Sequence, residues 1–280
     1  MRNRCASVWI SGLLLISGVS MMGASVPQET ALQGVIGFRL AGNSLIAVEG
    51  RLGQLDGLTL LIDTGTNQTV IDRSLVRRLS MASADPSGGA GRLIAPSIRF
   101  GPVHAPTVPV LTSDLHRLAD DLGVRLGAII GLDVLRGRCF VIDYVARTLT
   151  FDCPEKMGRA VSLDARSSRP LIDVTIEGEH RRMLVDTGAE AIMLFERSAP
   201  RVHVLEKSAS MARSLAGSRV PLRRFHAQNI TVGAHPVGPR PIFVAADPAG
   251  RVDYDGVFGV RWLSSRIMLD LERMVVGWKD

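Results

Sequence analysis

The stretch LLIDTGTNQTVI, residues 60–71, places a single acid inside an otherwise apolar run. An ionised Asp in such a run costs free energy unless hydrogen bonds or a second titrating group compensate it. Asp63 is therefore either fully hydrogen-bonded or functional. Residues 183–194, MLVDTGAEAIML, repeat the pattern with Asp186 in the place of Asp63. The two copies lie about one small domain apart in the chain, which indicates an internal duplication.

Two further segments repeat in the same order. The first copy is followed by SIRFGPVHAPTVPVLT (97–112) and then by AIIGLDVLRGRCFVIDYVARTLTF (128–151). The second copy is followed by NITVGAHPVGPRPIFVA (229–245) and then by GVFGVRWLSSRIMLDLERMVVGW (256–278). Because three matched segments in register are a poor fit to chance, we expect two consecutive units of similar structure.

The pattern along both units is that of an all-β protein. Short β-branched and aliphatic runs alternate with Gly, Pro, Asn and Asp, and each Asp-Thr-Gly ends the second strand of a hairpin. The hairpin turns are expected at 50–57 and near 177–180. Helical spacing of apolar residues predicts short helices at 71–80, where a preceding Asp can cap the helix, and at 113–125.

The chain of 280 residues, 46% of them hydrophobic, is long enough for two cores. Periodicity is lost between 153 and 169, so we divide the chain into units at 26–160 and 161–280. The net charge of +6 is mild and acids are interspersed, which gives little reason to expect a nucleic-acid partner. The one basic cluster, RSLAGSRVPLRR (213–224), is interpreted as a solvated loop.

The N-terminal residues 1–25 have a basic start, an apolar run over about 8–22 and small residues at the end. This is the pattern of a secretory signal peptide, with cleavage expected after Ser25. The alternative is an uncleaved anchor, since the apolar run approaches the ~20 residues of a spanning helix. A membrane is a partner only in that case. We expect an exported protein, either periplasmic or secreted.

Export makes two of the cysteines informative. Cys139 and Cys153 flank two expected strands with a turn centred on Ala146, a register that places Cys139 opposite Cys153. Opposed hairpin positions lie about 4.5 to 5.5 Å apart, which a disulfide accepts. We therefore predict a disulfide in an oxidising compartment. The alternative is two separate, reduced and half-buried thiols.

If the two units pack about a pseudo-twofold axis, Asp63 and Asp186 face each other across it. Two carboxylates a few ångströms apart cannot both ionise cheaply, so they share one proton and titrate as a coupled pair. Such a pair is an acid and a base at once, which suits water-mediated peptide hydrolysis. Gly65 and Gly188 permit close backbone approach, and the hydroxyls of the two intervening threonines, Thr64 and Thr187, can tie the loops together.

These motifs resemble the pepsin-like and retropepsin-like aspartic peptidases, over most of residues 45–280. The segment IIGLDVLRGRCFVIDYVARTLTF is the most specific match after the two Asp-Thr-Gly triplets. The resemblance implies a bilobal acid-protease fold of two retropepsin-like β-barrel lobes related by pseudo-twofold symmetry. It also implies that Asp63 and Asp186 are catalytic, that Thr64 and Thr187 cross-bond the two loops, and that Gly131 and Gly259 support them.

The family also covers its substrate with a glycine-rich flap. In the first unit the candidate flap is DPSGGAGR, with Gly88, Gly89 and Gly91. The two tyrosines, Tyr144 and Tyr254, lie outside this segment, so the flap tyrosine of pepsin-like enzymes is missing, as it is in retropepsins. The second unit has a basic and poorly matched counterpart of the flap around 213–224.

Other chemistries have little support in the sequence. The histidines form no metal-binding motif and no Gly-x-Ser-x-Gly occurs, so we expect no metal and no cofactor. Asp143 and Asp270 precede hairpin turns and are interpreted as turn caps. Asp133 has no acidic counterpart in the second unit, where Arg261 stands, and is interpreted as structural.

Two hypotheses of different classes follow. The first is an exported aspartic endopeptidase that acts on a protein or peptide substrate and is active as a monomer. The second is a non-catalytic peptide-binding or scaffold protein on the same fold, which grips an extended peptide by backbone pairing. A subsidiary possibility is that each half pairs with the same half of another chain.

Overall fold

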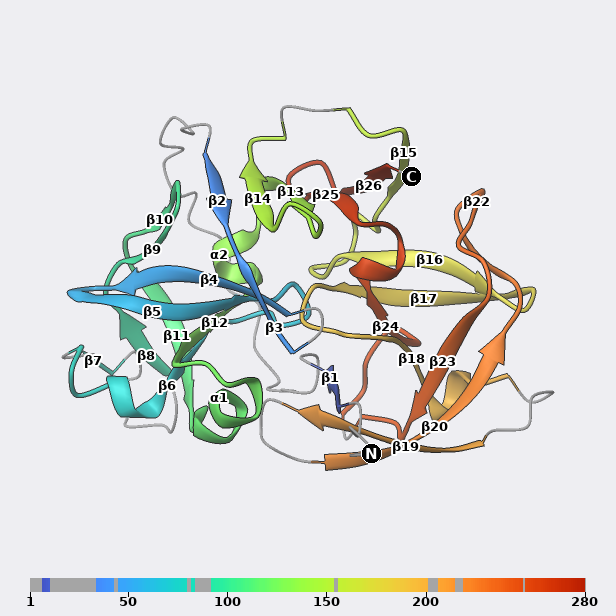
Figure 1. Ribbon diagram of the computed structural model, residues 1–280, viewed down its shortest axis with the longest axis horizontal. Helices are drawn as coiled ribbons and strands as arrows, with labels where there is room; N and C mark the ends of the chain where they lie inside the picture. Colours follow the sequence, from blue (N-terminus) through green and yellow to red (C-terminus); the bar gives the residue numbers. More distant parts are fainter. Residues whose placement is uncertain are drawn as a thin grey trace.

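A computed structural model describes nine segments of the chain, namely 7–10, 34–42, 45–79, 82–83, 92–153, 156–200, 206–214, 219–248 and 250–279. Within them the protein is built from three β-sheets, of ten, ten and six strands (Figure 1). Helical turns are short. They comprise η1 (Arg73–Leu75), α1 (His116–Leu122), α2 (Leu132–Leu135), η2 (Glu196–Ser198) and η3 (Val260–Trp262). The predicted all-β class is confirmed.

The first ten-stranded sheet belongs to the first half of the chain. Its order is β10-β9-β4-β5-β12-β6-β11-β8-β7, with β3 paired on β4. Its strands are β3 (Arg39–Ala41), β4 (Leu45–Leu52), β5 (Leu55–Ile62), β6 (Val70–Asp72), β7 (Ala82–Ser83), β8 (Arg92–Ala95), β9 (Ile98–Phe100), β10 (Val103–Ala105), β11 (Val108–Ser113) and β12 (Leu126–Ile130).

The second ten-stranded sheet has the order β1-β19-β20-β23-β18-β24-β17-β16-β21-β22. Apart from β1, which lies within the expected signal segment and pairs in parallel with β19, it comes from the second half. Its strands are β1 (Ser7–Ile10), β16 (Leu171–Ile176), β17 (Glu179–Asp186), β18 (Ile192–Phe195), β19 (Glu206–Ser214), β20 (Arg219–Ala227), β21 (Ile230–Val232), β22 (His235–Pro236), β23 (Arg240–Ala245) and β24 (Gly256–Gly259).

The two sheets repeat one connectivity, as the duplicated sequence predicts. In the first, β5 pairs in parallel with β12, β12 antiparallel with β6, and β6 in parallel with β11. In the second, β17, β24, β18 and β23 repeat these three pairings in the same order and sense. In each half, therefore, the strand that ends at Asp-Thr-Gly lies beside the strand that carries the later apolar-apolar-Gly.

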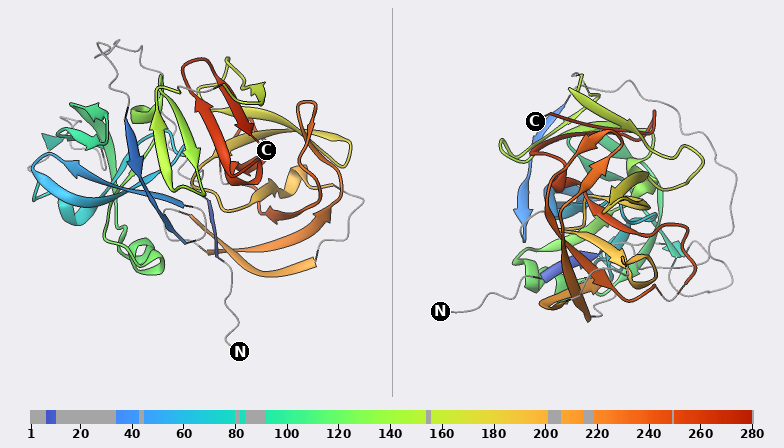
Figure 2. Two further views of the ribbon diagram at one scale, coloured as in Figure 1. Left: turned by 45° about the horizontal axis from the view of Figure 1, so that its top comes forward. Right: turned by 90° about the vertical axis from the view of Figure 1, so that its right-hand side faces the viewer.

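The six-stranded sheet joins the halves. Figure 2 (left) shows the blue β2, the yellow-green β13 and β14 and the red β25 and β26 as neighbours. The strands are β2 (Val35–Gly37), β13 (Cys139–Asp143), β14 (Thr148–Phe151), β15 (Arg159–Ser162), β25 (Arg266–Asp270) and β26 (Val275–Lys279). Because β13 pairs with β25 over five residues, the last hairpin of each half contributes to one continuous sheet.

Both faces of the strand before the first Asp-Thr-Gly are buried, which explains its continuous apolar run. Leu60 and Ile62 of β5 belong to the main core, which includes residues of both halves. Leu61 points to the other face and packs in a cluster with Leu118 of α1. Asp63 follows directly, so the strand delivers the acid to the interior of the protein.

Two expectations about local structure are corrected. A helix over 71–80 is wrong, because 70–72 continue as a strand paired in parallel with β11, and only η1 and turns follow. Asp72 does cap this segment, since its carboxylate accepts from the N–H of Ser74. The helix expected at 113–125 is confirmed as α1. The loop interpretation of 213–224 is also wrong where the structure describes it, because β19 and β20 form an antiparallel hairpin there.

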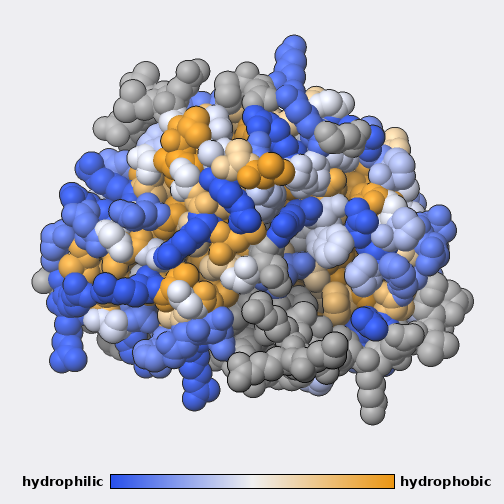
Figure 3. Space-filling view, in the orientation of Figure 1, coloured by the Kyte–Doolittle hydropathy of each residue, from blue (hydrophilic) through white to orange (hydrophobic). Residues whose placement is uncertain are grey.

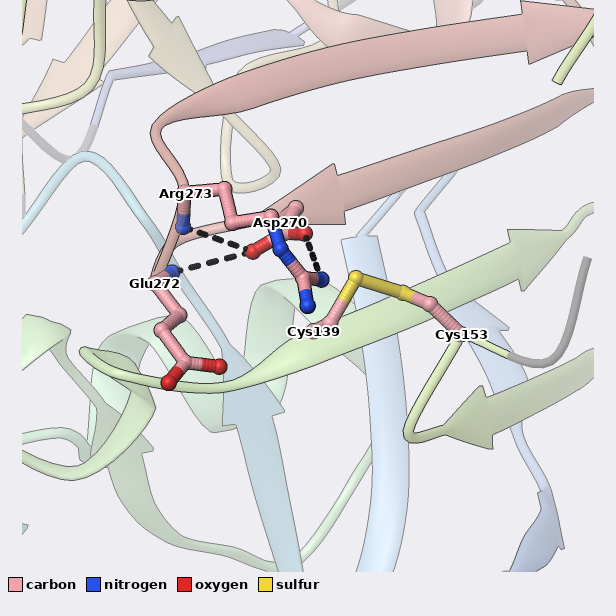
Figure 4. Close-up of a disulfide and its surroundings, with 5 residues drawn as sticks. All are labelled: Cys139, Cys153, Asp270, Glu272 and Arg273. Carbon is pink, nitrogen blue, oxygen red and sulfur yellow. Dashed lines mark hydrogen bonds and ion pairs between the residues drawn. A yellow bond between two sulfur atoms is a disulfide. The ribbon is translucent and has the colours of Figure 1, made fainter. Parts of the chain in front are cut away.

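The disulfide between Cys139 and Cys153 is present, with Cα atoms 5.5 Å apart (Figure 4). The register predicted for this hairpin is wrong by one residue. Phe140 pairs with Phe151, so Cys139 lies opposite Asp152, whose N–H donates to its carbonyl. Asp152 and Cys153 both have positive φ. This left-handed turn brings the second cysteine back to the first.

Candidate active site

Asp63 follows β5 directly and Asp186 is the last residue of β17, and both are buried, with exposed fractions of 2% and 0%. The N–H of Asp63 donates to the carbonyl of Ile130 in β12, at 3.0 Å. Asp186 lies in register with Gly259 of β24. Each Asp is thus held by the neighbouring parallel strand of its own half, as the repeated sequence predicts.

The two threonines bind the loops to each other across the halves. The backbone N–H of Thr64 donates to Oγ1 of Thr187, and the N–H of Thr187 donates to Oγ1 of Thr64, both at 3.1 Å. Each hydroxyl then donates to a carbonyl of the opposite strand, Thr64 to Val185 and Thr187 to Ile62, both at 2.8 Å. All four bonds are buried, so the reciprocal cross-bonding expected from the resemblance is observed.

The carboxylates are held by their own loops. The N–H of Gly65 donates to Oδ1 of Asp63 at 2.8 Å, and that of Gly188 to Oδ1 of Asp186 at 2.6 Å. A Cβ atom on Gly65 would lie 2.3 Å from Oδ2 of Asp186. Glycine is therefore required at this place, because the carboxylate of the second half lies against the loop backbone of the first.

The environment of Asp186 raises the pKa of its carboxyl group. Burial and then the negative charge of Asp63 raise its pKa well above the usual value, against the N–H of Gly188 and the charge of Arg169, which lower it. Its Oδ2 is buried and accepts from no N–H or hydroxyl group of the described residues, and a hydrogen bond with the carboxyl of Asp63 also raises the pKa. Two coupled carboxylates in such a place hold one proton between them over a range of pH.

Gly131 and Gly259 lie where a side chain would strike the loops. A Cβ on Gly131 would lie 2.8 Å from the carbonyl carbon of Gln68, and one on Gly259 would lie 2.6 Å from the carbonyl oxygen of Ala189. Since both neighbours are backbone atoms of the loop after Asp-Thr-Gly, neither can move aside cheaply. The two glycines therefore permit the close packing of supporting strand and loop.

Asp133 has the structural role that the sequence suggested. Its carboxylate accepts from the N–H of Thr69 at 2.8 Å and from its hydroxyl at 2.7 Å, and that hydroxyl in turn accepts from the N–H of Gly131. Burial raises the pKa of Asp133 above its ordinary value. In the second half, Trp262 Nε1 donates to the carbonyl of Glu190 instead.

Sequence reasoning missed two residues beside the pair. Arg169 donates from Nη1 to the carbonyl of Gly65 at 3.2 Å, and its guanidinium lies 5.8 Å from the ring centre of Tyr254, which is buried. The available signal was the repeat itself. Leu171 pairs with Leu184 as Ala47 pairs with Leu61, so Arg169 occupies the position that Leu45 has in the first half.

Other candidate residues lie elsewhere. Gly88, Gly89 and Gly91 of the candidate flap are outside the described residues. Cys139 is in β13 of the six-stranded sheet, in register with Asp270, and Cys153 lies just after β14 (Figure 4). Asp270 accepts from the N–H groups of Glu272 and Arg273, and Asp143 caps its own turn in the same way, so both turn-cap interpretations are confirmed.

The described residues contain no cluster of His, Cys, Asp and Glu that could hold a metal ion. None of the helices in the described segments is long and apolar enough to cross a membrane. On the face drawn in Figure 3, hydrophilic residues are spread widely with apolar residues among them.

Residues 172–265, about a third of the chain, match the family model of a gag-polyprotein putative aspartyl protease. No curated protein matches the chain. The matched region contains Asp186, Thr187, Gly188 and Gly259, and the first half, which repeats its strand connectivity, lies outside it. Together, the match and the all-β, retropepsin-like fold support a relationship of this chain to the aspartic peptidases and a protease function in general.

Proposed function

We propose that the protein is an aspartic endopeptidase in which Asp63 and Asp186 form one catalytic dyad within a single chain. The observation that carries the proposal is the reciprocal threonine cross-bonding, which fixes two buried carboxylates on opposite loops next to each other. Burial and like charge favour the state in which the pair holds a single proton.

The singly protonated pair supplies both groups that peptide hydrolysis needs. The ionised carboxylate takes a proton from a water molecule as the water oxygen bonds to the carbonyl carbon, while the protonated carboxyl gives its proton to the carbonyl oxygen. The resulting tetrahedral diol collapses as the C–N bond breaks: the nitrogen takes the proton that the first carboxylate received from water, and a diol hydroxyl returns a proton to the other carboxylate as its oxygen becomes the carbonyl oxygen of the product. The products are a carboxyl and an amine, and the dyad is again singly protonated.

The test is cleavage of a denatured-protein mixture between pH 3 and 8. We expect Asp63→Asn and Asp186→Asn each to abolish turnover, and a statine-type transition-state analogue to inhibit the wild type. Asp173→Asn is the matched control, because Asp173 is exposed on β16 and its substitution changes the charge equally. Cleavage that survives both dyad substitutions contradicts the proposal.

The non-catalytic alternative is separated by the same material. A scaffold on this fold binds extended peptides through backbone pairing but leaves them intact. Folded wild-type protein that binds peptide at every pH and cleaves none of it would favour that function. Because both acids come from one chain, we propose that the monomer is the active form, which the sedimentation mass of active protein tests.

We also propose that the protein is exported, to the periplasm or the medium, and that 26–160 and 161–280 are its two lobes. The signal-like composition of 1–25 supports export, and the disulfide fits an oxidising compartment. N-terminal sequencing of the exported protein is expected to begin at Val26. Full-length protein retained inside the cell would refute export.

A further inference from the structure

Arg169 is held next to the dyad by contacts from both halves. It lies just before β16, in the second half, and its Nη1 donates to the carbonyl of Gly65 in the loop of the first half, at 3.2 Å. Its guanidinium faces the ring of Tyr254 at 5.8 Å. Its backbone is also fixed, since its N–H donates to Ser167 and its carbonyl accepts from Leu171. The charge therefore has a defined place.

No carboxylate neutralises this arginine at contact distance among the described residues. Two other arginines nearby in the fold, Arg166 before β16 and Arg182 in β17, do have such a partner, because both pair with Asp164. An arginine that bonds to a neutral carbonyl and an aromatic ring keeps its full positive charge for groups farther away. Its charge acts on the dyad, because it lowers the pKa of Asp186.

The positive charge is on one side of the pseudo-symmetric pair. The hairpin registers place Leu45 of the first half where the second half has Arg169, and Leu45 is buried in an apolar cluster. The two halves therefore repeat the acids, glycines and threonines of the site but differ at this position. A cation in one half alone is not needed for the fold that both halves share.

The other groups around Asp186 do not replace Arg169. Asp63 faces it from the first loop with a like charge, and the two tyrosines are buried with pKa values raised by burial. Three other charged groups act on the tyrosines. Arg261 lies over the ring of Tyr144. Arg197 and Asp253 act on Tyr254.

We propose that Arg169 is a positioning residue of the dyad, whose fixed positive charge keeps the two carboxylates singly ionised to a lower pH than they would reach alone. The inference rests on the proposed function, because it assigns a role within that site. A cation beside the pair favours each ionised form over the protonated form before it. Both limbs of the activity profile therefore lie at lower pH in the wild type than in a protein without this charge.

The experiment compares wild type, Arg169→Gln, Arg169→Lys and Arg166→Gln. The last variant is the control, because it removes the same net charge from an exposed arginine whose side chain is 94% accessible. The readout is kcat/KM of one peptide substrate across pH 3 to 8, which reports the acid and base of the free enzyme.

We expect both limbs of Arg169→Gln to move to higher pH, so that kcat/KM on the acidic limb falls about threefold or more relative to wild type. Arg169→Lys should move less, and Arg166→Gln should superimpose on wild type. A profile of Arg169→Gln that keeps the wild-type midpoints, with only its height or KM changed, overturns the proposal. So does a Lys variant that moves as far as the Gln variant.

A second readout does not need activity. The pKa of Asp186 above its usual value makes the melting temperature fall as pH rises, and removal of Arg169 extends that fall to higher pH. If Arg169→Gln does not fold, Arg169→Leu, which restores the residue type of the first half, serves in both measurements. Inactive but folded wild type contradicts the proposed function. Active wild type with unmoved limbs contradicts this inference alone.

Discussion

Replacement of Thr64 by Val removes a hydroxyl that crosses between the halves and keeps the shape of the side chain. Two buried hydrogen bonds are lost, one donated to the carbonyl of Val185 and one accepted from the N–H of Thr187. A buried N–H without an acceptor costs about 1 to 3 kcal/mol, and the second bond contributes about 1 kcal/mol. We expect Thr64→Val to lower the free energy of unfolding by about 2 to 4 kcal/mol.

The assay is urea unfolding followed by tryptophan fluorescence and circular dichroism, with the midpoint and the slope fitted separately. Thr187→Val should cost the same as Thr64→Val, because its hydroxyl makes the mirror-image pair of bonds to Ile62 and Thr64. Thr64→Ser keeps both bonds and loses one methyl group, for which we expect about 1 kcal/mol. Thr107→Val, at an exposed position, should change stability by no more than about 0.5 kcal/mol.

The ordering of the variants is what tests the reasoning. If Thr64→Val costs no more than Thr64→Ser, the hydroxyl bonds between the halves contribute nothing net, and the apolar core alone holds the loops in place. A change of slope in the valine variants, with two separate transitions, would show instead that the halves unfold independently once the bonds are gone.

Three further predictions follow from the same contacts. Asp186→Asn should raise the melting temperature at pH 7. The pKa of the buried acid is raised, so the wild type loses stability as the pH climbs above the pKa of the unfolded state. The gain in melting temperature should vanish in scans below about pH 4. Gly131→Ala should lower the free energy of unfolding by about 1 to 3 kcal/mol, since its methyl group meets backbone of the loop. Gly158→Ala, which has no neighbour within 4 Å among the residues that the structure describes, should be neutral in the same urea titration. The double substitution Cys139→Ser and Cys153→Ser should lower the free energy of unfolding by about 3 kcal/mol, as expected for a loop of this size. Wild-type protein treated with reductant should lose the same amount in the same titration.

The parts of the structure that could be predicted from sequence are those whose sequence pattern occurs in both halves of the chain. Asp63 and Asp186 each come at the end of an apolar run, and each run is continuous because its strand is buried on both faces. The later apolar-apolar-Gly has to lie beside that run, since Gly131 and Gly259 carry no side chain where the loop passes. The two copies of the motif therefore support each other within a single sequence.

The errors arose where tertiary pairing overrides a local pattern. Residues 71–80 have helical spacing, but β6 gains a parallel partner in β11, and the strand wins over the helix that the local sequence favours. The cysteine register failed by one residue because the hairpin ends in a left-handed turn at Asp152 and Cys153. Positive φ is uncommon at non-glycine residues, and Asp152 and Cys153 alone do not predict it.

Arg169 was missed for a different reason, because the duplication that identified the dyad directs attention to what the halves share. The supports of the two loops in fact differ. The first loop is held by Thr69 and Asp133, and the second by Trp262 through the carbonyl of Glu190. Two acids with the same backbone geometry therefore lie in different fields, and the pair is unequal before any substrate binds. A single chain permits this, since each half can change without changing the other, whereas a symmetric dimer of identical halves has to carry every substitution twice.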